Sequence, residues 1–451
     1  MSTRKGQNVC RVGEPGSGKS KATSASIVIS DGAEIVMTPH EDDLSREILP
    51  HLSGNVLYAR LSDLEHSLGF EMLRPAANEM ENHRRVEAFV SILLRRRGVE
   101  GMASTPLMEE WVTSIVMLFL FQAKQKPLRF LPFGFLPGTE EFDELVKGCV
   151  IKEVAIKFRQ LEKLTPKALR AEVGSAARLI NAIFRSPAFI AWSRGGFDLG
   201  LFLEQKGKLL VERGEDIGDD AMRTIMAAII LLVIDHAKRR KQDWPTIRVR
   251  IDEATNAGLL TNTELRAAAE HNKKGLYFEF NLQRLDVPGS PDDLLQLCHR
   301  HEWYRLSEHG LARKAAVDII AGLPMSEEES RAQRIDKLTS EMMNLKPGEC
   351  YVRDRHGSRK EYVPLLQNPW PDWPGLREAK LLEQIRWIQN RDEYRRAAEP
   401  PSASSSKPET PPPTSSRDDS SPATRLKRRG KKPADGSSRS DGADESNPEA
   451  S

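Results

Sequence analysis

The sequence has few cysteines, a small net charge and no long apolar run, and each of these features excludes some kinds of site or classes of protein. Its four cysteines lie far apart among 451 residues, which excludes the short Cys spacing of a zinc site or a redox pair. Free thiols in a reducing compartment are expected at Cys10, Cys149, Cys298 and Cys350. The most apolar stretch, residues 225–234, is far shorter than the ~20 residues that cross a bilayer, and no signal peptide is recognisable. We expect a cytoplasmic protein without a membrane span, with this stretch in a buried helix.

The formal net charge of +2 is too small to indicate a nucleic-acid partner by itself. Basic residues are clustered instead, in residues 95–97, 238–241 and 425–432. From residue 399 to residue 451 the sequence is nearly all Ser, Pro, Gly and charged residues, so it cannot build a core and we expect a disordered tail. The basic cluster within this tail is either a nonspecific DNA tether or a solubilising segment.

One motif dominates what is present. Residues 13–20 match G-x-x-x-x-G-K-[ST], the phosphate-binding loop. Glycine permits positive φ, and successive N–H groups can then surround an anion at the start of a helix. Lys19 is expected to reach the β- and γ-phosphates, and the Ser20 hydroxyl is expected to ligate Mg²⁺. The predicted nucleotide-binding residues are Gly13, Glu14, Pro15, Gly16, Ser17, Gly18, Lys19 and Ser20.

Two later strands supply candidate partners for this loop. The strand at residues 247–251 ends in two acids, of which Asp252 is expected to hold Mg²⁺ and Glu253 to take a proton from the attacking water. The strand at residues 276–282 is followed by Gln283, which we predict beside the γ-phosphate, where it would act as a sensor of hydrolysis. The expected cofactors are ATP and Mg²⁺, and the expected catalytic residues are Lys19, Glu253 and Gln283.

Strands alternate with helices on both sides of a long helical stretch, which predicts an α/β fold with a mostly parallel sheet and an inserted all-α domain. Strands are expected at residues 8–12, 33–38, 55–60, 208–212, 247–251, 276–282 and 301–306, followed by a hairpin over 346–352 and 359–365. The helical stretch includes predicted helices at 81–96, 107–123, 142–161 and 166–184. Between the later strands, further helices are expected at 263–272 and 291–298. The expected domains are 1–70 and 201–398 for the α/β core, 71–200 for the insertion and 399–451 for the tail.

The predicted sheet carries unusual charge. A central parallel strand normally reads as continuous Val, Ile and Leu, but Arg248 and Arg250 alternate with apolar residues, and Arg11 and Glu279 lie in other strands. Buried charges must be paired. We therefore expect Arg248 or Arg250 to pair across strands with Glu279 or Glu212. The alternative is a poorly covered sheet face and a weakened ATPase.

The order of these motifs resembles the HerA/FtsK superfamily, and most closely the TraG/TraD-like coupling proteins of conjugative type IV secretion. GEPGSGKS, GKLLVE, IDEATN, KKGLYFEFNLQRL and LKPGECYV carry the resemblance, which covers residues 8–365. It implies a RecA-like P-loop ATPase that forms a hexameric ring and pumps DNA through a central channel. The helical insertion would meet the substrate or a relaxase, and a membrane secretion partner would recruit the protein to the inner membrane.

The sequence also departs from that family. No N-terminal membrane helices precede the phosphate loop, and the second strand runs into Thr38-Pro39-His40 instead of an Asp-x-Lys turn. Residues 273–275, Lys-Lys-Gly, stand where the family often has an arginine, so the identity of a trans-acting arginine stays open. The candidates are Arg266, Arg284, Arg300 and Arg305.

Three functions remain open at this point. The first is an ATP-driven DNA translocase of conjugation, mobilisation or a related mobile element. The second is a HerA-like or secretion-type motor of repair, defence or protein export. The third is a nucleotide-binding adaptor that does not hydrolyse ATP, which the charged strands favour and the intact Lys19, Ser20, Asp252 and Glu253 oppose.

Overall fold

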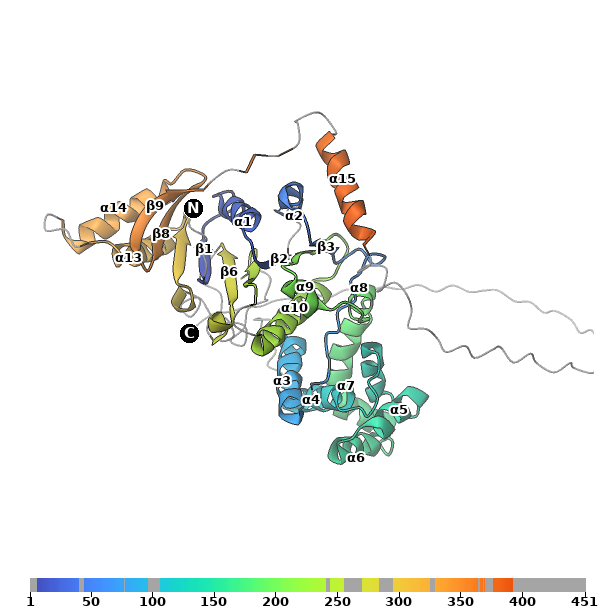
Figure 1. The fold of residues 1–451 in the computed structure, drawn as a ribbon. Helices are drawn as coiled ribbons and strands as arrows, with labels where there is room; N and C mark the ends of the chain where they lie inside the picture. The colour runs from blue at the N-terminus through green and yellow to red at the C-terminus, as the bar shows by residue number, and fades with distance from the viewer. Residues whose placement is uncertain are drawn as a thin grey trace, which may run out of the picture. The chain divides into compact units, whose positions relative to one another are not determined.

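Seven parallel strands and two antiparallel strands form one sheet in the described part of the chain (Figure 1). The computed structural model describes residues 6–39, 44–76, 78–95, 106–240, 244–254, 270–283, 295–324, 329–363, 366–367, 369 and 376–391. The strand order is β3-β4-β2-β5-β6-β1-β7-β8-β9. The strands are β1 (Val9–Val12), β2 (Ala33–Thr38), β3 (Val56–Arg60), β4 (Lys208–Glu212), β5 (Ile247–Ile251), β6 (Leu276–Leu282), β7 (Arg300–Trp303), β8 (Glu349–Asp354) and β9 (Gly357–Tyr362).

The strands at the centre of the sheet are buried on both faces. Every residue of β1, β2 and β5 is buried, which is typical of parallel strands joined by helical crossovers. The crossovers within the core use α1 (Lys19–Val28), α2 (Leu44–Ile48) and α10 (Asp219–Arg239). Beyond β7 come α13 (His309–Ile320), α14 (Arg331–Met343) and, after the hairpin, α15 (Leu376–Gln389). The predicted α/β fold with a mostly parallel sheet is confirmed.

Between β3 and β4 the regular elements of the described residues are all helices, as predicted for the insertion, and two isolated backbone bridges join other segments. These helices are α3 (Glu79–Arg95), α4 (Pro106–Leu120), α5 (Glu140–Gly148), α6 (Lys152–Leu161), α7 (Pro166–Phe184), α8 (Pro187–Trp192) and α9 (Leu199–Glu204), with a 3₁₀ segment at Leu128–Phe135. They pack on the core through α10, which contacts α3, α7, α8 and α9 (Figure 1). The apolar run at 225–234 lies in α10 and is largely buried. Among the described residues, no helix is long and apolar enough to cross a membrane.

One helix boundary was predicted wrongly. Residues 142–161 form two helices, α5 and α6, instead of one. The break occurs because the backbone at Cys149 pairs with the chain at Gln122: the Val150 N–H donates to the Phe121 carbonyl at 2.9 Å, and the Ala123 N–H donates to the Gly148 carbonyl at 2.8 Å. Backbone pairing between distant segments has overridden the local helical periodicity.

Other predicted elements differ by a few residues or fall in undescribed parts. Strand β7 ends at Trp303, and α14 was not predicted although Ser330 and Gln333 form a capping box at its start. Most of the helix predicted at 263–272, the start of the helix predicted at 291–298, and the tail lie outside the described residues.

A row of buried, alternating charges crosses the sheet. Arg250 Nε and Nη2 donate to the two carboxylate oxygens of Glu34 at 2.7 and 3.2 Å, and its Nη1 donates to Glu279. Arg11 Nη1 donates to the same Glu279 carboxylate at 2.7 Å, and Arg11 Nε donates to Glu302 at 2.8 Å. These five side chains are at most 2% exposed. One of the predicted pairings, that of Arg250 with Glu279, is therefore confirmed. We call these five residues the charge row.

Helix α1 covers the charge row with hydroxyl groups. Arg250 Nη1 donates to Ser26 Oγ at 2.9 Å, and Arg11 Nη1 donates to Thr23 Oγ1 at 3.3 Å. The Lys208 ammonium on the same side donates to two carbonyls of the α1 region, each at 3.0 Å. The alternative of a poorly covered sheet face is wrong. Glu212, the other predicted partner, accepts instead from the Tyr58 hydroxyl at 2.7 Å.

The charge row extends into the C-terminal hairpin through Arg300. Its Nε donates to Glu302 at 2.6 Å, while its two terminal nitrogens donate to Asp354 of β8 at 3.3 Å and Glu361 of β9 at 2.7 Å. Burial would raise the pKa of Glu279, but the neighbouring arginines, Arg250 first, lower it to about 2.

We expect Glu279→Gln to lower the free energy of unfolding by about 3–5 kcal/mol, because it leaves Arg11 and Arg250 buried without a shared counter-charge. Urea denaturation at pH 7 measures the change. Glu47→Gln is the control: it removes a surface pair with Lys21, in which the lysine side chain is 52% exposed, and should cost less than about 1 kcal/mol. Equal effects of the two substitutions would contradict the prediction.

The Glu279 contribution should also depend on pH in a defined direction. Its folded-state pKa of about 2 lies below the ordinary value of 4.5, so its stabilisation is fully present above pH 4.5 and is lost as the pH falls towards 2. The difference in unfolding free energy between wild type and Glu279→Gln should therefore shrink between these two pH values. A difference that stays constant over this range would show that Glu279 does not titrate as proposed.

Candidate functional site

The predicted phosphate loop connects β1 to α1 and has the backbone that its glycines permit. Gly16 and Gly18 have φ values of 72° and 107°, in the left-handed region that favours glycine. The Gly13 N–H donates to the Leu282 carbonyl at the end of β6 (3.1 Å), and the Glu14 N–H donates to the Arg305 carbonyl beyond β7 (3.0 Å). The loop is thus suspended between the carboxyl ends of the two strands that flank β1.

Lys19 lies inside the loop. Its Nζ donates to the carbonyls of Gly13 at 2.5 Å and Glu14 at 2.9 Å, and the residue is 6% exposed. Burial lowers the pKa of Lys19, and the nearby carboxylates of Asp252, Glu253 and Glu14 oppose this effect. The ammonium has carbonyl partners but no paired carboxylate among the described residues, which fits a group that binds phosphate oxygens.

The two predicted metal ligands are adjacent. Ser20 Oγ donates to Asp252 Oδ2 at 3.3 Å, although the residues are far apart in sequence. Nearby, the Ser17 hydroxyl is buried and has no hydrogen-bond partner among the described residues. A hydroxyl beside a carboxylate is the oxygen donor set that Mg²⁺ prefers, and the N–H groups of the loop suit phosphate oxygens. These residues fit a magnesium nucleotide.

Asn281 completes this arrangement and was missed by the sequence analysis. Its Nδ2 donates to Asp252 Oδ1 at 2.7 Å and lies 2.9 Å from Thr23 Oγ1. Thr23 in turn contacts Arg11 of the charge row. The available signal was the alternation of Glu279, Asn281 and Gln283, which puts three polar side chains on one face of the chain at β6.

The two predicted catalytic residues that follow β5 and β6 contact each other. Gln283 Nε2 donates to Glu253 Oε1. Glu253 has a φ of 46°, in the left-handed region that non-glycine residues rarely adopt. Its backbone is therefore held under strain by the surrounding structure, as is common at functional sites.

The candidates for a trans-acting arginine differ in their burial and in their partners. Arg300 is buried in the continuation of the charge row, so it is not available to a neighbouring subunit. Arg305 pairs with Glu14 of its own phosphate loop. Arg266 and Arg284 lie outside the described residues.

The turn before β8 supports the phosphate loop from the other side. The Gly348 N–H donates to the Ser17 carbonyl at 2.9 Å, and a Cβ added to Gly18 would lie 2.9 Å from the Gly348 nitrogen. The LKPGECYV segment, one of those that carry the family resemblance, therefore contributes directly to the shape of the loop.

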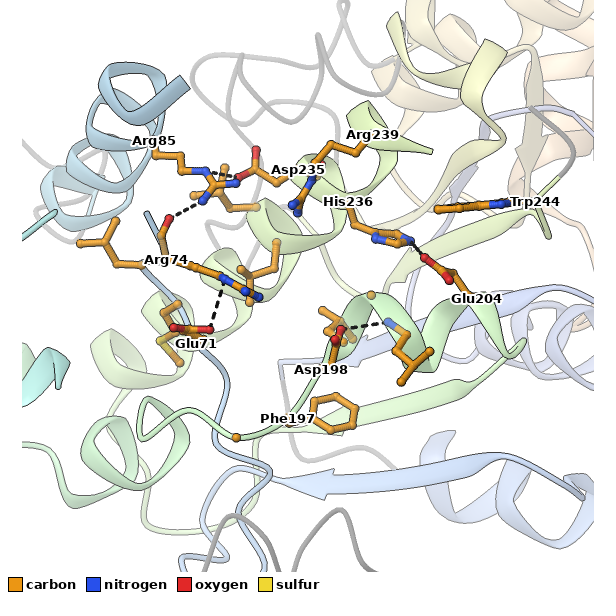
Figure 2. Close-up of a pocket in the computed structure, with 18 residues that line it drawn as sticks. Glu71, Arg74, Arg85, Phe197, Asp198, Glu204, Asp235, His236, Arg239 and Trp244 are labelled. Carbon is orange, nitrogen blue, oxygen red and sulfur yellow. Dashed lines mark hydrogen bonds and ion pairs between the residues drawn. The ribbon is translucent and has the colours of Figure 1, made fainter. Parts of the chain in front are cut away.

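A separate pocket of about 550 Å³ lies at the opposite ends of the strands, where α9 and α10 lead into β4 and β5 (Figure 2). A buried ion pair crosses it, from Arg85 Nε of α3 to Asp235 Oδ2 of α10 at 3.1 Å. Burial lowers the pKa of His236 in its wall to about 4, so the imidazole is neutral at pH 7. This pocket joins the helical insertion to the core and shares no residue with the phosphate loop.

No protein-family model and no curated protein sequence matches the chain. Solved structures do match it. The unbound bacterial conjugative coupling protein TrwBΔN70 aligns with a TM-score of 0.58 at 16% identity, covering 82% of this chain and 88% of that one. The chain has the coupling-protein fold. TrwB in complex with ADP and Mg²⁺ gives a TM-score of 0.58 at 16% identity, with 81% and 88% covered.

VirB4 of Thermoanaerobacter pseudethanolicus aligns with a TM-score of 0.51 at 12% identity, covering 80% of this chain and 90% of that one. The coupling-protein fold confirms the RecA-like P-loop architecture that the sequence resemblance implied. In this chain the phosphate loop, Asp252 and Glu253 lie together at the carboxyl ends of the parallel strands of that fold.

Substitution of the two loop glycines separates backbone strain from crowding. Gly16→Ala meets nothing within 4 Å, so its cost is the strain of a positive φ, about 1–2 kcal/mol. Gly18→Ala has the same strain and also clashes with the Gly348 backbone, so its loss of unfolding free energy should be about 1–3 kcal/mol larger. Urea denaturation of both variants measures the difference. Equal losses would mean that the turn before β8 does not confine the loop.

Proposed function

We propose that this chain is an ATP-hydrolysing motor that moves DNA, as expected of coupling proteins in conjugation, mobilisation or a related mobile-element process. The observation that carries the proposal is the convergence of Lys19, Ser20, Asp252 and Glu253 at one edge of a sheet with the coupling-protein fold. TrwB structures with this fold contain ADP with Mg²⁺ or a non-hydrolysable ATP analogue, which supports ATP and Mg²⁺ as the cofactors here.

The residues of the loop would bind the nucleotide. Lys19 would leave the carbonyls of Gly13 and Glu14 and donate to the β- and γ-phosphate oxygens. Ser20 and Asp252 would hold Mg²⁺, which neutralises charge on the phosphates when bound. Asn281 would keep the Asp252 carboxylate turned towards this position through its 2.7 Å hydrogen bond.

Glu253 would act as the general base by accepting a proton from the attacking water. The amide of Gln283 donates to this carboxylate, which fixes its orientation. Both residues follow strands whose carboxyl ends lie beside the phosphate loop. Loss of the γ-phosphate would therefore change the position of Gln283, and through it that of Glu253. This supports the predicted role of Gln283 as a sensor of hydrolysis.

We further propose the assembly that the coupling-protein fold implies. Residues 1–70 and 201–398 would form the ATPase core of a hexameric ring, and residues 71–200 would face DNA or a relaxase. A membrane secretion partner would recruit this cytoplasmic protein to the inner membrane. The VirB4 match favours one second candidate, a secretion-type motor ATPase that moves protein.

ATP hydrolysis by the purified chain, with and without double- and single-stranded DNA, tests the proposal. We expect DNA-stimulated turnover. Glu253→Gln should lower kcat at least ~100-fold while retaining ATP binding, because it removes only the base. Lys19→Ala should lose binding as well. Lys21→Ala is the matched control, since its side chain is 52% exposed and pairs with Glu47.

Other outcomes of this assay favour other functions. ATP binding without turnover under any DNA condition would indicate the adaptor. Turnover that DNA does not stimulate would indicate the secretion-type motor.

The role of Asn281 has a specific readout in the same assay. Asn281→Ala should raise the Mg²⁺ concentration for half-maximal hydrolysis about 10-fold, because one hydrogen bond to a charged group is worth about 1.5–3 kcal/mol. Asn344→Ala, at the exposed end of α14, serves as the control. A lower kcat with an unchanged Mg²⁺ dependence would contradict a role in orienting the metal ligand.

A further inference from the structure

The second residue of the phosphate loop is an acid, Glu14, and this is unfavourable for a loop that binds phosphate. A carboxylate near the site repels a polyanionic ligand, and the effect is strong where water is partly excluded. The Glu14 side chain is 21% exposed, so solvent screens it incompletely. The same residue contributes the carbonyl that accepts from Lys19 Nζ at 2.9 Å. Its charge is therefore close to the cation on which phosphate binding depends.

Arg305 holds Glu14 at two points. Its Nε donates to Glu14 Oε1, and its backbone carbonyl accepts from the Glu14 N–H at 3.0 Å. The backbone contact continues the parallel pairing of β1 with β7, since the Tyr304 N–H donates to the Val12 carbonyl at 2.8 Å. The position of Arg305 beside the loop is thus set by the sheet. The side-chain contact adds a positive charge at the one acidic residue of residues 13–20.

Removal of the Arg305 guanidinium would leave Lys19 as the cation nearest to the acid within the loop. The Lys19 ammonium already contacts the Glu14 backbone, and the Glu14 carboxylate attracts it. An ammonium drawn to a carboxylate of its own loop is less available to a phosphate. Pairing of Arg305 with Glu14 therefore prevents both repulsion of the ligand and loss of Lys19.

We propose that Arg305 acts within its own subunit as a positioning residue, which neutralises Glu14 and keeps Lys19 available to the nucleotide phosphates. This inference rests on the proposed function, because it concerns nucleotide binding by the same loop. It also assigns Arg305 a role different from that of an arginine donated to a neighbouring subunit. Nucleotide affinity then depends on the pair: loss of the arginine weakens binding only while the acid is present.

A double-mutant cycle tests the pair. The Kd for ADP with Mg²⁺ is measured by calorimetry on the full chain for wild type, Arg305→Ala, Glu14→Gln and the double variant. We expect Arg305→Ala to weaken binding about 10-fold, which corresponds to 1.4 kcal/mol. Glu14→Gln should bind at least as tightly as wild type, and the double variant should return to within about 3-fold of it. A double variant as weak as Arg305→Ala would overturn the proposal.

Two further measurements separate charge from packing. Arg305→Lys should recover most of the affinity, because it keeps the charge, and the defect of Arg305→Ala should shrink at 0.5 M NaCl, because screening weakens the repulsion. A defect that salt and lysine both leave unchanged would overturn the proposal. Lack of ADP binding by the wild type would overturn the proposed function together with this inference, whereas wild-type binding with an unchanged Kd in Arg305→Ala would overturn only the role of Arg305.

Discussion

The rest of the structure depends on the ion pairs that the Glu279 carboxylate makes with two buried arginines. This carboxylate lies between Arg250 of β5 and Arg11 of β1 and is almost completely buried. The strands that carry these three residues each supply a part of the candidate site. Strand β1 leads into the phosphate loop, β5 leads into Asp252, and β6 contains Asn281. Together with the backbone pairing of the strands, these two ion pairs therefore link three segments that are distant in sequence but meet within hydrogen-bond distance.

The charge row is better understood as a determinant of geometry than as a source of stability. A well-packed apolar core of the same volume would often be at least as stable as buried ion pairs, because desolvation offsets their attraction. Polar contacts instead continue without interruption from the row to the site: Arg11 contacts Thr23, Thr23 contacts Asn281, and Asn281 contacts Asp252. An apolar core offers no directional contact of this kind. We infer that the strands keep their charges because the site needs a defined orientation of Asp252.

Sequence reasoning reached the parts of this protein that local patterns encode. The phosphate loop is a contiguous motif, and the charged strands required pairing on physical grounds, so the Arg250–Glu279 contact was among the pairings that could be predicted. The contacts of Arg11 with Glu302 could not, because they depend on β1 lying between β6 and β7, which no local pattern specifies. Asn281 was missed because its role depends on Asp252, which the pairing of β5 with β6 brings beside it. The interrupted helix at Cys149 likewise follows from pairing with a distant segment.

The position of β1 in the sheet has a consequence for how the chain is made. Both of its neighbours, β6 and β7, are synthesised more than 250 residues later, and the turn that supports the loop follows later still at Gly348. The phosphate loop is thus made well before the strands and the turn that complete its surroundings. Long-range pairing of this kind is slow, and an apolar strand that waits for its partners is prone to aggregate. Arg11 lies in the middle of that strand. Its charge would oppose aggregation of the strand until the carboxylates that pair with Arg11 have been synthesised.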